Sequence, residues 1–202
     1  MIAIIDYGCG NLFSLSSSLK SLGIDCKITG DADEISSAEK IILPGVGAFG
    51  DAAEKLRESG MDELLRSQAE NGKYILGICL GMQLLFDKSF EYGEHKGLSL
   101  IKGVVAPLEG DISEKLKIPH MGWNKLDIVR DDPIFKYIKP GDYMYFVHSF
   151  YAKECDESLL ASAEYCVNVP AVVKNGSVYG MQFHPEKSGA KGLALLKAFS
   201  EI

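Results

Sequence analysis

The chain has 202 residues, which fits one sizeable domain with a core large enough to be stable alone. Hydrophobic residues make up 47% and charged residues 24%, as in ordinary globular proteins, and no apolar run is long enough to span a bilayer. The formal net charge of -7 argues against a nucleic-acid backbone as the main partner.

The five cysteines indicate a reducing compartment. They are odd in number and scattered, with no C-x-x-C pair, so neither a disulfide framework nor a metal site is expected. The apolar start, residues 1–5, lacks a basic segment and is followed at once by Asp6, so it predicts a first strand rather than a signal peptide. We therefore expect a cytoplasmic protein that binds no metal.

The first half of the chain alternates between predicted strands and helices. Apolar or β-branched runs predict strands at residues 1–6, 24–29, 40–43 and 74–78. Helical spacing of apolar residues predicts helices at residues 11–22, 51–59, 62–70 and 80–86. An acidic connector is expected at residues 31–34, and a loop at 44–50, because glycine and proline are unfavourable inside strands. This rhythm predicts a parallel sheet wrapped by helices.

The Gly-rich turn at residues 6–11 could cradle a phosphate. However, the third glycine of the dinucleotide-binding fingerprint is missing, because Phe13 stands at that position. The turn is better explained as a tight strand-to-helix connection with Asn11 near the helix N-cap.

The second half of the chain is richer in short strands. A polar loop is expected at residues 87–95, and strands are expected at 98–108, 125–129, 142–146, 159–165, 171–174 and 177–183. A closing helix is predicted at residues 188–199. No repeat or linker divides the chain, so residues 1–202 are expected to form a single domain.

Cys79 stands at the junction of a predicted strand and helix, between Gly77 and Gly81. This is the geometry of a nucleophile elbow, with cysteine in place of serine. The free N–H groups of the first helical turn would stabilise a thiolate and an oxyanion. A buried structural cysteine between two packing glycines would give the same pattern, so the elbow needs support from elsewhere in the chain.

A cysteine nucleophile needs a base, and the base needs an orienting group. His184 ends a predicted strand just before a helix, which places it at a sheet edge, as Cys79 is. Glu186 stands two residues further on and could accept the second imidazole N–H. A surface His-Pro turn with a solvated glutamate is an equally good explanation of this stretch alone.

Taken together, residues 77–83 and 182–186 resemble the two signature motifs of the class I, triad-type glutamine amidotransferases. The resemblance implies a flavodoxin-like α/β fold, with a mixed, mostly parallel sheet and helices on both faces. It also implies that Cys79 attacks glutamine, that His184 transfers the proton and that Glu186 orients His184. No cofactor is implied.

Within this class the chain resembles the glutaminase subunits of imidazole glycerol phosphate synthase (HisH type). The stretches that carry this likeness are residues 6–11, 44–49, 119–124 and 146–150. The resemblance implies a hydrolase that passes ammonia to a (β/α)8-barrel cyclase subunit (HisF type), as a heterodimer with lyase activity in histidine biosynthesis. It implies no membrane or nucleic-acid partner.

The resemblance also assigns further site residues. The oxyanion would be held by backbone N–H groups at Leu80 and the segment of Val46 and Gly47, where a peptide flip could assemble the site. Glutamine recognition would involve Gln83, Glu91, Ser149 and Phe150. The partner interface would include Asn11, Trp123, Tyr145 and Lys187.

The other histidines and cysteines are expected to play lesser parts. His95 is expected to be solvated, His148 to shape the glutamine pocket, and His120 to belong to a partner surface with Met121 and Trp123, although a core tryptophan fits nearly as well. The remaining cysteines are expected to be small packing residues: Cys9, Cys26, Cys155 and Cys166.

Three alternative functions stay open at the level of sequence. A related amidotransferase subunit could serve a different acceptor, such as a surface-sugar precursor. A cysteine hydrolase with a flavodoxin-like core is disfavoured, because α/β-hydrolases place the triad acid on a separate strand before the histidine. A non-catalytic binding module is disfavoured because Cys79, His184 and Glu186 are all present.

Overall fold

A computed structural model describes residues 1–112 and 116–202 of the chain. The helices are α1 (Leu12–Ser21), α2 (Ala32–Ser37), α3 (Phe49–Glu58), α4 (Met61–Glu70), α5 (Leu80–Leu84) and α6 (Gly189–Glu201). The strands of the main sheet are β1 (Ile2–Ile5), β2 (Cys26–Thr29), β3 (Lys40–Gly45), β4 (Tyr74–Cys79), β9 (Asp127–Ile128), β12 (Leu159–Tyr165), β13 (Val167–Asn175) and β14 (Val178–Met181).

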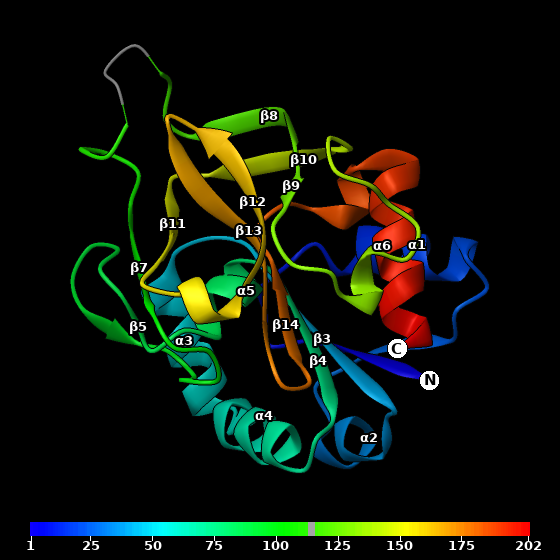
Figure 1. The fold of residues 1–202 in the computed structure, drawn as a ribbon. Helices are drawn as coiled ribbons and strands as arrows, with labels where there is room; N and C mark the ends of the chain where they lie inside the picture. Colours follow the sequence, from blue (N-terminus) through cyan, green and yellow to red (C-terminus); the bar gives the residue numbers. More distant parts are fainter. Residues whose placement is uncertain (113–115) are drawn as a thin grey trace.

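The main sheet has the order β2-β1-β3-β4-β14-β13-β12-β9 and is shown in Figure 1. Its first five strands run parallel, and β13, β12 and β9 extend it by antiparallel pairing. The expected mixed, mostly parallel sheet is therefore confirmed.

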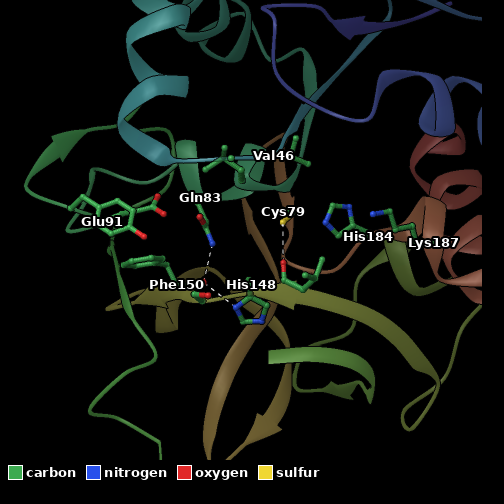
Figure 2. Close-up of a pocket in the computed structure, with 13 residues that line it drawn as sticks. Val46, Cys79, Gln83, Glu91, His148, Phe150, His184 and Lys187 are labelled. Atoms are coloured by element: carbon green, nitrogen blue, oxygen red, sulfur yellow. Dashed lines mark hydrogen bonds between the residues drawn. The ribbon is translucent and has the colours of Figure 1, made fainter. Parts of the chain in front are cut away.

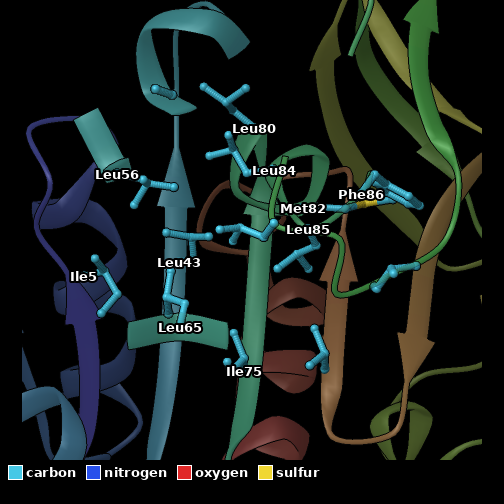
Figure 3. Packing of buried hydrophobic residues seen from close by; sticks show 14 of the residues in the cluster. Ile5, Leu43, Leu56, Leu65, Ile75, Leu80, Met82, Leu84, Leu85 and Phe86 are labelled. Carbon is cyan, nitrogen blue, oxygen red and sulfur yellow. The ribbon is translucent and has the colours of Figure 1, made fainter. Parts of the chain in front are cut away.

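Helices cover both faces of this sheet. On one face α1 and α6 pack through residues such as Leu15 and Leu195. On the other face lie α2, α3, α4 and α5, and their apolar side chains pack against the strands around Leu43 and Ile75 (Figure 3). Apolar burial on both faces explains why β1, β3 and β4 read as continuous hydrophobic runs rather than alternating ones.

Two smaller sheets stand beside the carboxyl ends of the central strands. One pairs β8 (His120–Lys125) with β10 (Tyr143–His148), antiparallel. The other contains β11 (Phe150–Lys153), β7 (Val104–Pro107), β5 (Lys88–Ser89) and β6 (His95–Lys96). Three short 3-10 helices, η1 (Pro133–Phe135), η2 (Asp156–Ser158) and η3 (Pro185–Lys187), complete the described part of the chain.

Several expectations about single elements were wrong. The acidic connector is the start of helix α2, because the Asp31 carboxylate accepts from the N–H groups of Asp33 and Glu34 as an N-cap. Strand β3 continues through Pro44 and Gly45, which pair with Ile78 and Cys79 at the last rungs of the parallel ladder. The predicted helix after Cys79 is shorter than expected and ends at Leu84.

Other errors concern the second half. Residues 98–108 were expected to form one strand, but only β7 within them is a strand. The first residues of this stretch bind the end of α5 instead, because the Leu98 N–H donates to the Leu84 carbonyl. Strands β8 and β11 were not expected, and the polar stretch 87–95 contains β5 and the first residue of β6. In the described residues no helix is long and apolar enough to cross a membrane.

Candidate active site

The carboxyl ends of three parallel strands meet at one point of the main sheet. The register places Gly45 of β3 beside Cys79 of β4, and Met181 of β14 beside Ile78. His184 follows β14 by a few residues. Open α/β sheets carry their sites at such carboxyl edges.

Cys79 occupies a strained backbone position at the end of β4. Its φ of 55° and ψ of -112° are unusual for a residue with a side chain. The thiol lies 3.9 Å from the Val147 carbonyl and 3.9 Å from the Gln182 amide nitrogen, and the residue is only 8% exposed. This is the expected elbow, with the sulfur held at the wall of a pocket (Figure 2).

His184 and Glu186 form a buried pair beside the thiol. His184 Nδ1 lies 2.8 Å from Glu186 Oε1, and the two side chains are 4% and 3% exposed. Because a carboxylate only accepts, Nδ1 donates its proton to Glu186, and Nε2 is the ring nitrogen that can exchange a proton with the nucleophile. Burial lowers the pKa of His184, but the hydrogen bonds with Cys79 and Glu186 outweigh it and raise that pKa to about 9.

The pocket beside Cys79 has a volume of about 360 Å³, large enough for an amino acid. The residues expected to hold the oxyanion or glutamine all line it: Val46, Gly47, Leu80, Gln83, Glu91, Ser149 and Phe150. Lys187, expected at a partner interface, also lines this pocket, as do Tyr92, Val147 and His148.

Glu91 ties the pocket wall to helix α3. Its Oε2 accepts from the Phe49 N–H at 2.6 Å, at a helix start whose N-cap, Ala48, offers no side-chain bond. Burial raises the pKa of Glu91, and the bond from Phe49 opposes that rise. The carboxylate therefore has a backbone partner and still faces the pocket.

Gln83 is held by two polar partners. Its Nε2 donates to the Phe150 carbonyl at 2.9 Å and to Gln182 Oε1 at 3.1 Å. Gln182, fully buried, links Gln83 to Cys79, and sequence reasoning did not single it out. Its position two residues before His184 in the distal motif was the available signal.

The remaining residues expected at the interface lie outside the pocket lining. Asn11 caps α1 by accepting from the Ser14 N–H, and it borders a small second cavity that Val46 and Glu186 also line. Trp123 is 56% exposed, and its ring meets that of Tyr145 edge-on at 6.1 Å. The alternative of a core tryptophan is thus wrong.

One histidine expectation was wrong. His120 is 3% exposed rather than part of a surface, because it points inward from β8 while its neighbours Met121 and Trp123 are exposed. His95 is half-buried, with its ring against Gly50. Among the cysteines, Cys166 is exposed rather than packed.

Comparison with known proteins agrees with this geometry. Residues 3–201 match the family model described as glutamine amidotransferase class-I. An imidazole glycerol phosphate synthase subunit HisH of Caldanaerobacter subterraneus subsp. tengcongensis is 52% identical, over 100% of this chain and 98% of the relative. The subunit of the same name from Geobacillus kaustophilus is 51% identical, over 100% and 97%.

Solved structures show the same fold at lower identity. One described as the crystal structure of glutamine amidotransferase has a TM-score of 0.77 at 20% identity, covering 100% of this chain and 98% of the other. PurLQS from Thermotoga maritima has a TM-score of 0.77 at 22% identity, over 99% and 97%. Because the family model spans nearly the whole chain, this protein belongs to the class-I glutamine amidotransferases.

Proposed function

We propose that this chain is the glutaminase subunit of imidazole glycerol phosphate synthase and supplies ammonia for histidine biosynthesis. The observation that carries the proposal is the buried His184–Glu186 pair beside the strained Cys79, in one pocket of amino-acid size. The two HisH relatives are each about half identical to this chain over its full length. They favour a role in histidine biosynthesis over ammonia supply to a surface-sugar precursor. Residues 1–202 act as one amidotransferase domain.

The reaction proceeds in two steps. In the first, the Cys79 thiol gives its proton to His184 Nε2 and Sγ attacks the side-chain amide carbon of glutamine. Nε2 then passes that proton to the leaving nitrogen as the C–N bond breaks, which releases ammonia. In the second, His184 takes a proton from water, which attacks the γ-glutamyl thioester and releases glutamate and the thiol. Glu186 fixes the tautomer and stabilises the imidazolium through Nδ1.

The surrounding residues hold the reacting groups. The N–H of Leu80 and one N–H of the segment formed by Val46 and Gly47 stabilise the oxyanion. Val46 is 45% exposed and Gly47 has a φ of 104°, so this segment is free to reorient by a peptide flip. The polar groups of glutamine bind Gln83, Glu91 and the backbone near Ser149 and Phe150.

The ammonia passes to a cyclase subunit of (β/α)8-barrel type, and the two subunits form a heterodimer. Asn11, Trp123, Tyr145 and Lys187 belong to the contact region, which the exposure of Trp123 supports. We place the enzyme in the cytoplasm, without nucleic-acid or membrane partners; five cysteines that are all free are in keeping with a reducing compartment.

Covalent labelling tests the assignment of the nucleophile. A glutamine analogue carrying a diazo-ketone should attach to one thiol, and mass mapping should find it on Cys79. Excess glutamine should protect that thiol. A label on Cys9 or Cys166 that glutamine does not prevent would contradict the proposal.

A further inference from the structure

A continuous chain of hydrogen bonds runs from strand β8 to the wall of the glutamine pocket. Asn124 Nδ2 lies 3.2 Å from His120 Nε2, and His120 Nδ1 lies 3.0 Å from His148 Nε2. His148 Nδ1 then lies 2.9 Å from the Phe150 carbonyl, which also accepts from Gln83 Nε2 at 2.9 Å (Figure 2). His148, Phe150 and Gln83 line the pocket. Asn124 and His120 do not.

The direction of every proton in this chain is fixed from the pocket end. A carbonyl only accepts, so His148 carries its proton on Nδ1 and presents a lone pair on Nε2. His120 must therefore donate from Nδ1, which leaves a lone pair on its own Nε2. That lone pair requires a donor, and the amide nitrogen of Asn124 is the donor present.

The direction is fixed independently from the opposite end. Asn124 Oδ1 accepts from the Lys125 N–H at 2.9 Å, and Asn124 Nδ2 also donates to the Glu164 carbonyl at 2.8 Å. These two backbone groups orient the amide so that nitrogen, not oxygen, faces His120. Both ends of the hydrogen-bond chain require the same order of donors and acceptors. All of its hydrogen bonds can therefore form in one arrangement of protons only.

The imidazole rings are held in position and kept neutral. His120 is stacked between Phe146 and Tyr165, with centroid distances of 4.8 Å and 4.0 Å. Burial lowers the pKa of His120 to about 4. Burial, and then the neighbouring His120, lower the pKa of His148 to about 3, against the bond to the Phe150 carbonyl. Neutral rings each keep one donor and one acceptor, as the chain requires.

We infer that Asn124 and His120 are positioning residues for the substrate glutamine, acting through His148 on the Phe150 carbonyl and the Gln83 amide. The inference rests on the proposed function and adds two residues that do not touch the pocket. The Phe150 carbonyl accepts hydrogen bonds from both His148 and Gln83. A change of tautomer at His120 would therefore loosen both His148 and Gln83 in the pocket wall.

The substitution Asn124→Asp tests this directly. The aspartate still accepts from the Lys125 N–H, but its second oxygen faces the lone pair of His120 Nε2 and the Glu164 carbonyl. His120 must then bind a proton at Nε2, either as an imidazolium or by a tautomer switch that His148 has to follow. The KM for glutamine should rise roughly tenfold, the size expected when a half-buried hydrogen bond becomes a repulsion, with a smaller change in kcat.

Asn168→Asp is a matched control. Asn168 is exposed and pairs with Glu164 on the neighbouring strand, but it is not a member of the hydrogen-bond chain. The same charge change at Asn168 should therefore leave the KM for glutamine within twofold of the wild type. Asn124→Leu provides a second variant if the aspartate fails to fold. It removes the donor without adding charge, and should raise KM less than Asn124→Asp.

The readouts separate a positioning role from a purely structural one. Nitrogen-15 NMR should show protons on Nδ1 of both His120 and His148 in the wild type, and a proton on His120 Nε2 in Asn124→Asp. Synthesis driven by free ammonia in the complex with the cyclase should be equal in all variants. Equal KM values for Asn124→Asp and Asn168→Asp, or Nε2–H histidines in the wild type, would overturn the inference. A wild type that does not hydrolyse glutamine would instead overturn the proposed function.

Discussion

At the scale of residues, the site depends on a backbone conformation that cysteine rarely adopts. A φ of 55° at Cys79 costs about 1–3 kcal/mol, which the surrounding packing has to offset. The benefit is a thiol that projects past the end of β4 next to His184. The glycines on either side make this possible, because a Cβ at Gly77 would lie 2.6 Å from the Gly81 carbonyl oxygen.

The coupling of His184 to Glu186 predicts a pH dependence. With a folded pKa of about 9 against roughly 6.5 unfolded, the imidazolium contributes stability fully below pH 6.5 and loses it as the pH rises through 9. Glu186→Gln removes the negative partner, so the basic limb of kcat/KM should move to lower pH and kcat should fall at least tenfold. Glutamine affinity should stay near normal. An unmoved basic limb, matching that of the exposed control Glu157→Gln, would rule out the role given to Glu186.

The two buried histidines of the hydrogen-bond chain, His120 and His148, predict a loss of stability in acid. Their folded pKa values, about 4 for His120 and about 3 for His148, lie below the unfolded value. Their stabilising effect is therefore present above pH 6.5 and falls as the pH decreases, by about 2 kcal/mol per histidine at pH 5. Urea unfolding at pH 7 and 5 should show this loss, and His120→Gln should reduce it. His95→Gln should not; equal losses in both variants would contradict the account.

At the scale of elements, the site follows from parallel strands whose carboxyl ends meet. The register between β3, β4 and β14 brings Val46, Cys79 and His184 together although they are far apart in sequence. The sequence predicted these strands well, because strands buried on both faces read as uninterrupted apolar runs. Strand β8 escaped prediction because residues 120–125 alternate between inward and outward side chains without an apolar pattern.

The close approach of α5 to β3 can be measured. A Cβ at Gly81 would collide with the Leu43 carbonyl oxygen, which belongs to a buried strand and cannot move aside. Gly81→Ala should therefore lower the free energy of unfolding by at least about 3 kcal/mol. Gly72→Ala is the control: its φ is 77° but nothing lies within 4 Å, so only about 1 kcal/mol should be lost. Equal losses would show that the contact is not tight.

At the scale of the whole molecule, sequence patterns predicted the fold class and the order of the main elements. The candidate triad came from two motifs, and the structure places all three side chains together. Two features could not be predicted from the sequence: the inward orientation of His120, and the position of Lys187 at the pocket rather than only at the surface. Both depend on contacts between segments distant in sequence, such as the pairing of β8 with β10, which no local periodicity reveals.

The role of Cys79 in supplying ammonia from glutamine is tested most directly with the chain and its cyclase subunit together. Formation of imidazole glycerol phosphate is followed with glutamine and, separately, with ammonium as the nitrogen source. The wild type should use both, and Cys79→Ala should lose glutamine-dependent synthesis by at least about a thousandfold while ammonia-dependent synthesis is unchanged. Glutamine-dependent synthesis that persists in Cys79→Ala would contradict this role. So would a wild-type complex that forms imidazole glycerol phosphate from ammonium but not from glutamine.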